Sequence, residues 1–228
     1  MTALHLADGR EAADLAAFLS RLLHYDRAAA VRLQASGTAL AVFGRPPSFE
    51  VLAIRSVRLA KPYEDGLEVT LDVTVSAGEL LESVDETAST AAVPAAVTGP
   101  PWAGVLPPRG GWRAEPGLPA PDALRALVAA AVTEFRTRTE ALTAESRTRA
   151  ELDRIGREIW SRTVGRSDLP VRAVHAAQSL GFLRPLGPAD TDGEPVLLAS
   201  GAWLRLRTPY GSVALRRAGL GAFGLSVR

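Results

Sequence analysis

The sequence predicts an α+β protein in which an N-terminal antiparallel sheet packs against one helix and a C-terminal helical domain carries a winged-helix-like hairpin. Three observations favour this fold: an amphipathic helical segment leads into short alternating segments, prolines gather in mid-chain, and a long helical run precedes a hairpin pattern. We therefore expect a sheet domain over 1–85, an ordered connector over 86–121 and a helical domain over 122–228.

The first helix should cover residues 9–25. Asp8 and Glu11 have the spacing of a capping box, and apolar residues follow at helical spacing: Leu15, Phe18, Leu19, Leu22 and Leu23. Extended segments separated by glycine or proline turns then predict strands over 29–34, 38–43, 49–60 and 67–75. The last of these alternates apolar and polar residues, which is typical of a sheet with one buried and one solvated face.

Residues 86–121 hold eight of the 16 prolines, which excludes a regular helix or a central strand there. The segment also contains Trp102, Val105, Leu106 and Trp112. These side chains would expose a large apolar area if they were free in solvent. We therefore expect the connector to be ordered and to pack on a neighbouring domain.

A helical run opens the second half, because no glycine or proline interrupts residues 122–155 and an apolar stripe marks its start. The stripe fails beyond residue 136, and Thr148 and Glu151 form a second capping box. This pattern fits either one long exposed helix or two helices with a kink near 143–148. Ion pairs at i,i+4 spacing are expected on its surface: Glu134 with Arg138, Glu145 with Arg149, and Asp153 with Arg157. The region 122–164 is the candidate surface for a homodimer.

The order of elements in residues 149–217 resembles a winged helix-turn-helix. A tight connection over 165–169 leads to a helix over 170–180, which ends at a glycine cap. The hairpin strands that would form the wing are expected at 196–199, 203–207 and 211–217.

This arrangement makes DNA a candidate partner for residues 170–217. The helix would turn polar side chains toward base edges, and the hairpin would hold phosphates. The candidate contacts are Arg172, His175, Gln178, Arg205, Arg207, Arg216 and Arg217. Residues 121–228 carry 16 basic and 11 acidic groups, against 10 and 14 in residues 1–120, so a polyanion would prefer the second half.

Composition excludes several chemistries. The chain has 228 residues, of which 47% are hydrophobic and 22% charged, and no cysteine, so it should fold but cannot use thiols or cysteine zinc sites. Neither a leader peptide nor an apolar run long enough to span a bilayer is evident, which predicts a cytoplasmic protein without a membrane partner.

Motif searches identify no catalytic residue, cofactor site or metal site. The three histidines lack metal-ligand spacing, and no nucleophile elbow or phosphate loop occurs. A G-x-G-x-x-G pattern at Gly219–Gly224 is followed by too few residues for the helix that a dinucleotide site requires. Glu68 and Asp72, on a predicted open sheet face, are the remaining carboxylates for an enzyme of unknown class.

The stretches Pro107–Trp112 and His175–Leu183 resemble segments of hypothetical proteins from high-GC actinobacteria. That resemblance implies a bacterial lineage but does not imply any activity. Three classes of function therefore stay open, in this order: a non-enzymatic regulatory or protein-interaction module, a winged-helix DNA-binding regulator, and an enzyme of unknown class.

Overall fold

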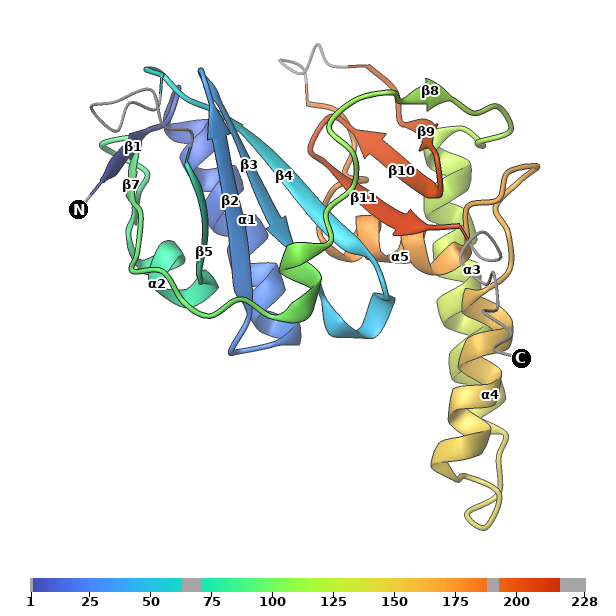
Figure 1. The fold of residues 1–228 in the computed structure, drawn as a ribbon. Coiled ribbons are helices and arrows are strands. Elements are labelled where there is room, and N and C mark those ends of the chain that lie inside the picture. The colour runs from blue at the N-terminus through green and yellow to red at the C-terminus, as the bar shows by residue number, and fades with distance from the viewer. Residues whose placement is uncertain (1, 63–70, 188–192, 218–228) are drawn as a thin grey trace, which may run out of the picture.

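The structure is a computed structural model that describes residues 2–62, 71–187 and 193–217. It confirms the α+β fold. The strands from the N-terminal half are β2 (Ala30–Ser36), β3 (Ala39–Gly44), β4 (Leu52–Arg58) and β5 (Asp72–Ser76). Those from the C-terminal half are β8 (Arg113–Ala114), β9 (Val196–Ser200), β10 (Trp203–Thr208) and β11 (Gly211–Arg216). Within the described ranges these strands form one antiparallel sheet in the order β5-β2-β3-β4-β11-β10-β9-β8 (Figure 1).

A smaller sheet and the helices complete the fold. The smaller sheet has the order β1 (Ala3–His5), β7 (Thr90–Ala92), β6 (Val84–Asp85). The helices are α1 (Gly9–Tyr25), α2 (Ala77–Glu82), α3 (Pro121–Glu140), α4 (Arg149–Trp160) and α5 (Val171–Ser179), with short 3-10 turns η1 (Pro47–Phe49) and η2 (Pro101–Gly104).

Local sequence signals account for the N-terminal elements. The Asp8 carboxylate accepts a hydrogen bond from the Glu11 amide at 2.9 Å, so the predicted cap and the predicted helix over 9–25 are both confirmed. The strand expected from residue 49 begins later, at Leu52, because η1 and the left-handed Glu50 (φ 52°) precede it. Of the strand expected over 67–75, β5 begins at Asp72, and residues 67–70 lie outside the described residues.

The two halves of the chain share the large sheet. Strand β11 pairs antiparallel with β4, with Ser212 opposite Ile54 and Ala214 opposite Leu52. Next to this junction the rings of Phe18 and Phe182 stack with centroids 5.7 Å apart, which joins α1 to the segment that follows α5. One hydrophobic core therefore extends under both halves of the sheet.

A buried guanidinium fastens the same junction. Arg55 on β4 has a side chain that is only 7% exposed, and it lies 3.1 Å from Glu11 and 3.2 Å from Asp14 on α1. It also donates to the Tyr210 carbonyl, in the turn between β10 and β11, at 2.8 Å. Arg184 then pairs with Asp14 at 2.8 Å. The carboxylates of α1 thus bind arginines from both halves of the chain.

The proline-rich segment covers the other face of the sheet. Trp102 and Leu106 pack on a second apolar cluster formed by Phe43, Leu52, Ile54 and Ala214. Figure 1 shows this segment, in green, passing from η2 in front of the sheet to β8. Apolar contacts therefore position the connector, although it contains few regular elements.

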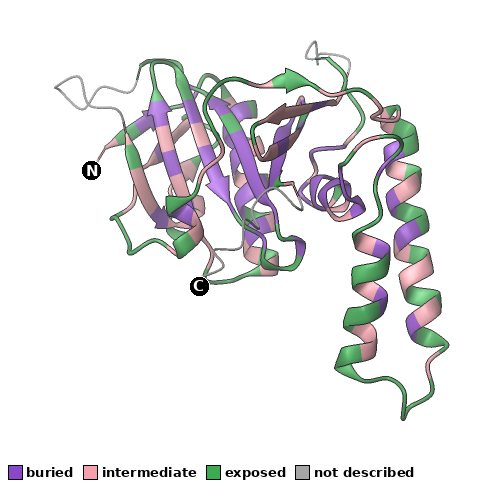
Figure 2. Ribbon diagram, turned by 45° about the vertical axis from the view of Figure 1, so that its right-hand side comes forward, coloured by how far each residue is buried: buried purple, intermediate pink, exposed green. Residues whose placement is uncertain are grey.

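The region 122–164 forms two helices, α3 and α4, rather than one. Thr148 caps α4 by accepting a hydrogen bond from the Glu151 amide at 3.2 Å, as its capping box predicts. Together α3 and α4 form a hairpin that projects from the body (Figure 1) and is largely exposed toward its tip (Figure 2). Of the expected ion pairs, Glu134 with Arg138 is present at 3.3 Å.

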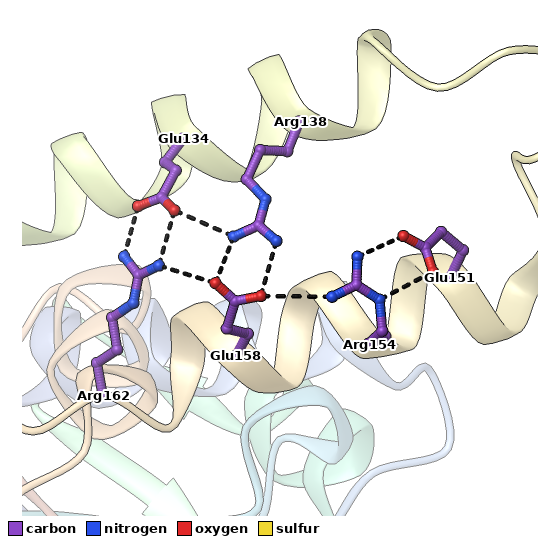
Figure 3. A network of polar contacts seen from close by, with 6 residues as sticks. All are labelled: Glu134, Arg138, Glu151, Arg154, Glu158 and Arg162. Carbon is purple, nitrogen blue, oxygen red and sulfur yellow. Dashed lines mark hydrogen bonds and ion pairs between the residues drawn. The ribbon is translucent and has the colours of Figure 1, made fainter.

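One face of this hairpin carries a ladder of ion pairs (Figure 3). Arg138 holds both carboxylate oxygens of Glu158 at 2.7 Å, and Arg162 binds both oxygens of Glu134 at 2.5 and 2.8 Å. The ladder extends along α4 through Arg154, which pairs with Glu158 at 3.5 Å. These bidentate contacts set the register of the two helices.

The winged-helix resemblance is not confirmed. Five of the nine residues of α5 are buried: Val171, Ala173, Val174, Ala176 and Ala177. The predicted wing, β10–β11, is paired on both sides, to β9 and to β4. A recognition helix and a wing need exposed surfaces, whereas here the helix belongs to the core and the hairpin to the middle of a sheet. The Schellman cap expected after α5 is present, with the Phe182 amide donating to the Ala177 carbonyl at 2.7 Å and Gly181 at φ +76°.

We predict that Glu158→Gln weakens the hairpin in a pH-dependent way. Hydrogen bonds from Arg138 lower the pKa of the Glu158 carboxyl from 4.5 to about 2. A lowered folded-state pKa means that the contribution is complete above pH 4.5 and is lost as the pH falls through about 2. The difference in melting temperature between wild type and variant should therefore be present at pH 7 and shrink toward pH 2.

Carbon-13 NMR of the Glu158 carboxyl checks this directly, with Glu140→Gln at the exposed end of α3 as the control. Titration of Glu158 near pH 4.5, or a difference in melting temperature that does not depend on pH, would contradict it.

Removal of the buried guanidinium should be far more costly. Arg55→Met leaves Glu11 and Asp14 facing each other without their shared cation, and we expect a loss of about 3–5 kcal/mol in the free energy of unfolding. The matched control is Arg58→Gln on the same strand. Arg58 also contacts Glu11, but its side chain is 74% exposed, so its loss should be below about 1 kcal/mol. Urea denaturation of both variants measures the two losses, and similar values would refute the assignment.

Candidate functional site

A groove of about 1080 Å³ lies between the α3–α4 hairpin and the body of the molecule. One wall is the inner side of α4, the other is η1, and α5 contributes residues between them. Its lining contains aromatic rings from five separate elements: Tyr25, Phe49, Phe135, Trp160 and His175. Volume, concavity and a mostly apolar lining are the features of a small-molecule site.

The rings form a continuous row. Tyr25 meets Phe49 edge to face at 5.2 Å, and Phe49 meets His175 in the same way at 5.1 Å. The His175 ring then stacks on Trp160 at 4.7 Å, and Trp160 meets Phe135 at 5.9 Å. Each ring restricts its neighbours, so the row offers a preformed surface for another planar ring.

His175 is uncharged within this row at neutral pH. Burial among the rings lowers the pKa of its imidazole below 6.5. In the described part of the chain no side chain or carbonyl group makes a hydrogen bond to either ring nitrogen. A general base normally has a partner that orients it, and His175 is positioned by stacking instead.

Three arginines lie around the rings, and they differ in whether a carboxylate neutralises their charge. Arg149 pairs with Asp153 at 3.1 Å, and Arg172 lies 3.5 Å from Glu50. Arg157 is exposed and has no ion pair among the described residues. The expected pairs of Arg149 with Glu145 and of Arg157 with Asp153 do not form, because Arg149 takes Asp153. Among the described residues, the groove therefore keeps one arginine, Arg157, without an ion pair.

A glycine keeps the α4 wall of the groove open. At Gly156, a Cβ atom would lie 3.5 Å from Trp160 and 3.7 Å from Phe135, which is ordinary contact. An alanine would fit there, but a longer side chain would extend between the two rings. The site can thus accept a planar ring against Trp160 and His175, with an anionic group directed to Arg157.

The structure separates the residues that the sequence grouped as DNA contacts. Arg172 and His175 line the groove, and Gln178 is exposed on α5. The hairpin residues Arg205, Arg207 and Arg216 lie on the sheet face opposite α5. Arg217 is tied to Glu115 at 2.6 Å and to Asp168 at 3.7 Å. The seven residues therefore do not form one surface.

Sequence reasoning missed four of the aromatic groups in the groove. Tyr25 and Trp160 are the last residues of α1 and α4, Phe49 lies in a turn, and Phe135 lies in the apolar stripe of α3. Aromatic residues at helix ends were a usable signal. However, their convergence depends on how α4 and η1 are placed against α5, which local patterns do not show.

The other sequence-based candidates form no site in the described residues. Asp72 is held by Arg32 at 2.7 Å and by Gln34 at 3.0 Å, and the Arg32 hydrogen bond lowers the pKa of its carboxyl. Glu68 and the glycine pattern Gly219–Gly224 lie outside the described residues.

Within the described ranges, no group of histidine and carboxylate side chains is arranged to hold a metal ion. None of the helices in those ranges has the length and apolarity that a bilayer crossing requires. The cytoplasmic location stays a prediction.

Comparison with known families divides the chain at the connector. The model of a domain of unknown function, DUF8010, matches residues 1–104, and that of another, DUF8185, matches residues 107–220. A search of curated proteins finds no match. Neither family has an assigned activity, and the actinobacterial origin stays a prediction. Because its model covers half of the protein, the chain belongs to the DUF8185 family, with a DUF8010 domain before it.

Proposed function

We propose that the protein is a non-enzymatic regulatory module that binds a planar aromatic anion in the groove between the α3–α4 hairpin and the body. The observation that carries this proposal is the row of rings from Tyr25 to Phe135 in a groove that is also lined by Arg157, an arginine without an ion pair among the described residues. A ligand ring would stack in the row, and its carboxylate, sulfonate or phosphate would meet Arg157.

A regulatory role is supported by the elements that meet at the groove. Tyr25 and Phe49 belong to the DUF8010 half, whereas Phe135, Trp160 and His175 belong to the DUF8185 half. A ligand between them would contact both halves and would stabilise the arrangement in which they are joined. The position of His175, held by stacking and without a hydrogen-bond partner among the described residues, supports binding rather than acid–base catalysis.

We predict that the purified protein binds 1-anilinonaphthalene-8-sulfonate at a single saturable site. Gly156→Leu should weaken binding at least tenfold, because the new side chain would extend between Trp160 and Phe135. Arg157→Gln should weaken this sulfonate several-fold but leave N-phenyl-1-naphthylamine, its uncharged analogue, unchanged. Fluorescence titration of each variant with both probes measures these effects.

The matched control is Arg154→Gln. It removes the same charge from a residue of α4 that does not line the groove and that pairs with Glu151 and Glu158 in the ion-pair ladder, and it should leave both probes unaffected. Circular dichroism spectra confirm that each variant is folded. Absence of saturable binding, or binding that is insensitive to both Gly156→Leu and Arg157→Gln, would refute the proposal.

The homodimer predicted through residues 122–164 is a separate proposal. The supporting observation is that the α3–α4 hairpin projects from the body and is largely exposed (Figure 2). We expect the sedimentation coefficient to rise with protein concentration in wild type and to be lower when the exposed hairpin residues Arg136 and Glu140 are both changed to Ala. A coefficient that stays monomeric across the micromolar range would remove the dimer from consideration.

A further inference from the structure

A second cationic surface lies on the large sheet, on the face opposite α5. Strand register places Arg205 opposite Ala214, Arg207 opposite Ser212 and Trp203 opposite Arg216. Residues that face each other across antiparallel strands share one side of the sheet. Ala214 and Trp203 belong to the apolar cluster under the connector, so this side is the connector side.

The arginines of this surface have no acidic partner in the part of the chain that the structure describes. Among the described residues, Arg205, Arg207 and Arg216 form no ion pair, whereas Arg217 beside them pairs with Glu115. The Arg205 Nε atom is buried without a hydrogen-bond acceptor. Burial, and then the charge of Arg207, lowers the pKa of its guanidinium. Like charges kept together without a counterion destabilise the fold, so a bound anion would relieve the strain.

Two tryptophans accompany these cations. The Arg205 guanidinium lies 5.8 Å from the ring of Trp112, and that of Arg216 lies 5.4 Å from the ring of Trp203. Trp112 is fixed by a hydrogen bond from its Nε1 to the Pro108 carbonyl at 2.9 Å. Both indoles are only partly buried. Flat rings and guanidinium groups therefore alternate along the open side of β10 and β11.

The surface continues into a hollow of about 420 Å³. Its lining includes Trp203, Arg216, Trp102 and the exposed Val105. Glu50, which neutralises Arg172, also borders it. A flat, partly apolar group next to a phosphate would find both of its binding partners here.

We infer that this Arg–Trp face, formed by Trp112, Trp203, Arg205, Arg207 and Arg216, binds single-stranded nucleic acid. The three arginines contact phosphates, and the indoles stack on unpaired bases, as in other sheets that bind single strands. A duplex is disfavoured because its bases are already stacked and because α5, the helix that would enter a major groove, is buried behind the sheet. The hollow beside this face shares Glu50 and Arg172 with the aromatic groove, but none of the five residues of the face lines that groove.

The test is fluorescence anisotropy of a fluorescein-labelled single-stranded oligothymidylate of about 20 nucleotides. Three phosphate contacts predict a logarithmic salt slope near −2, which is a roughly 20-fold loss of affinity between about 50 and 200 mM salt. Changing Arg205, Arg207 and Arg216 together to Gln should weaken binding at least tenfold. Trp203→Ala should weaken the oligothymidylate more than an abasic oligomer of equal length, because only the former can stack.

The matched control removes the same charge elsewhere, by Arg113→Gln, Arg147→Gln and Arg166→Gln together. Arg113 is on β8, at the edge of the same sheet, and shares the side of Ala199, which is opposite to the side of Arg205. The other two are exposed outside the sheet. Thermal melts confirm that each variant is folded. The inference is overturned if no binding occurs at about 50 mM salt, if the duplex of equal length binds more tightly, if the abasic oligomer binds equally well, or if both triple variants bind alike. Loss of sulfonate binding in the groove would not affect any of these outcomes.

Discussion

The guanidinium of Arg55 is the interaction on which the arrangement of this protein depends. It is almost completely buried, and a charge in that position is stable only while Glu11, Asp14 and the Tyr210 carbonyl surround it. Those partners come from the first helix and from the last hairpin of the sheet. Burial of one cation therefore holds the first and last thirds of the chain together, and the pairing of β4 with β11 continues the same junction in the backbone.

The shared sheet determines which surfaces of the protein are open to ligands. Its helix side is occupied by the core, and the aromatic groove opens only where the hairpin of α3 and α4 leaves the body. Its connector side is closed over β3 and β4 by Trp102 and Leu106 but leaves Arg207 of β10 and Arg216 of β11 exposed, with Arg205 partly buried between them. The two candidate binding surfaces therefore lie on different sides of one sheet, and each is bordered by residues from both family matches.

Local patterns predicted the elements well where a few neighbouring residues set the outcome. Asp8 and Thr148 cap their helices as their spacing indicates, and the glycine cap at Gly181 ends α5 at the expected point. Both readings of residues 122–164 were compatible with the sequence, and the break between α3 and α4 settled the choice. The winged helix was not confirmed, because the order of elements along a chain does not determine which strands pair in the sheet.

By itself, the sequence determined the element types, the absence of thiol chemistry and the basic character of the second half, because these depend on residue identity and on spacings of three or four positions. Tertiary structure alone decided that Ala173 and Ala176 are buried, that Arg205 and Arg207 face away from α5, and that His175 stacks on Trp160. The physical reason is that the side on which a residue lies follows from strand pairing and helix packing between distant segments, and those long-range contacts leave no periodic mark in the local sequence.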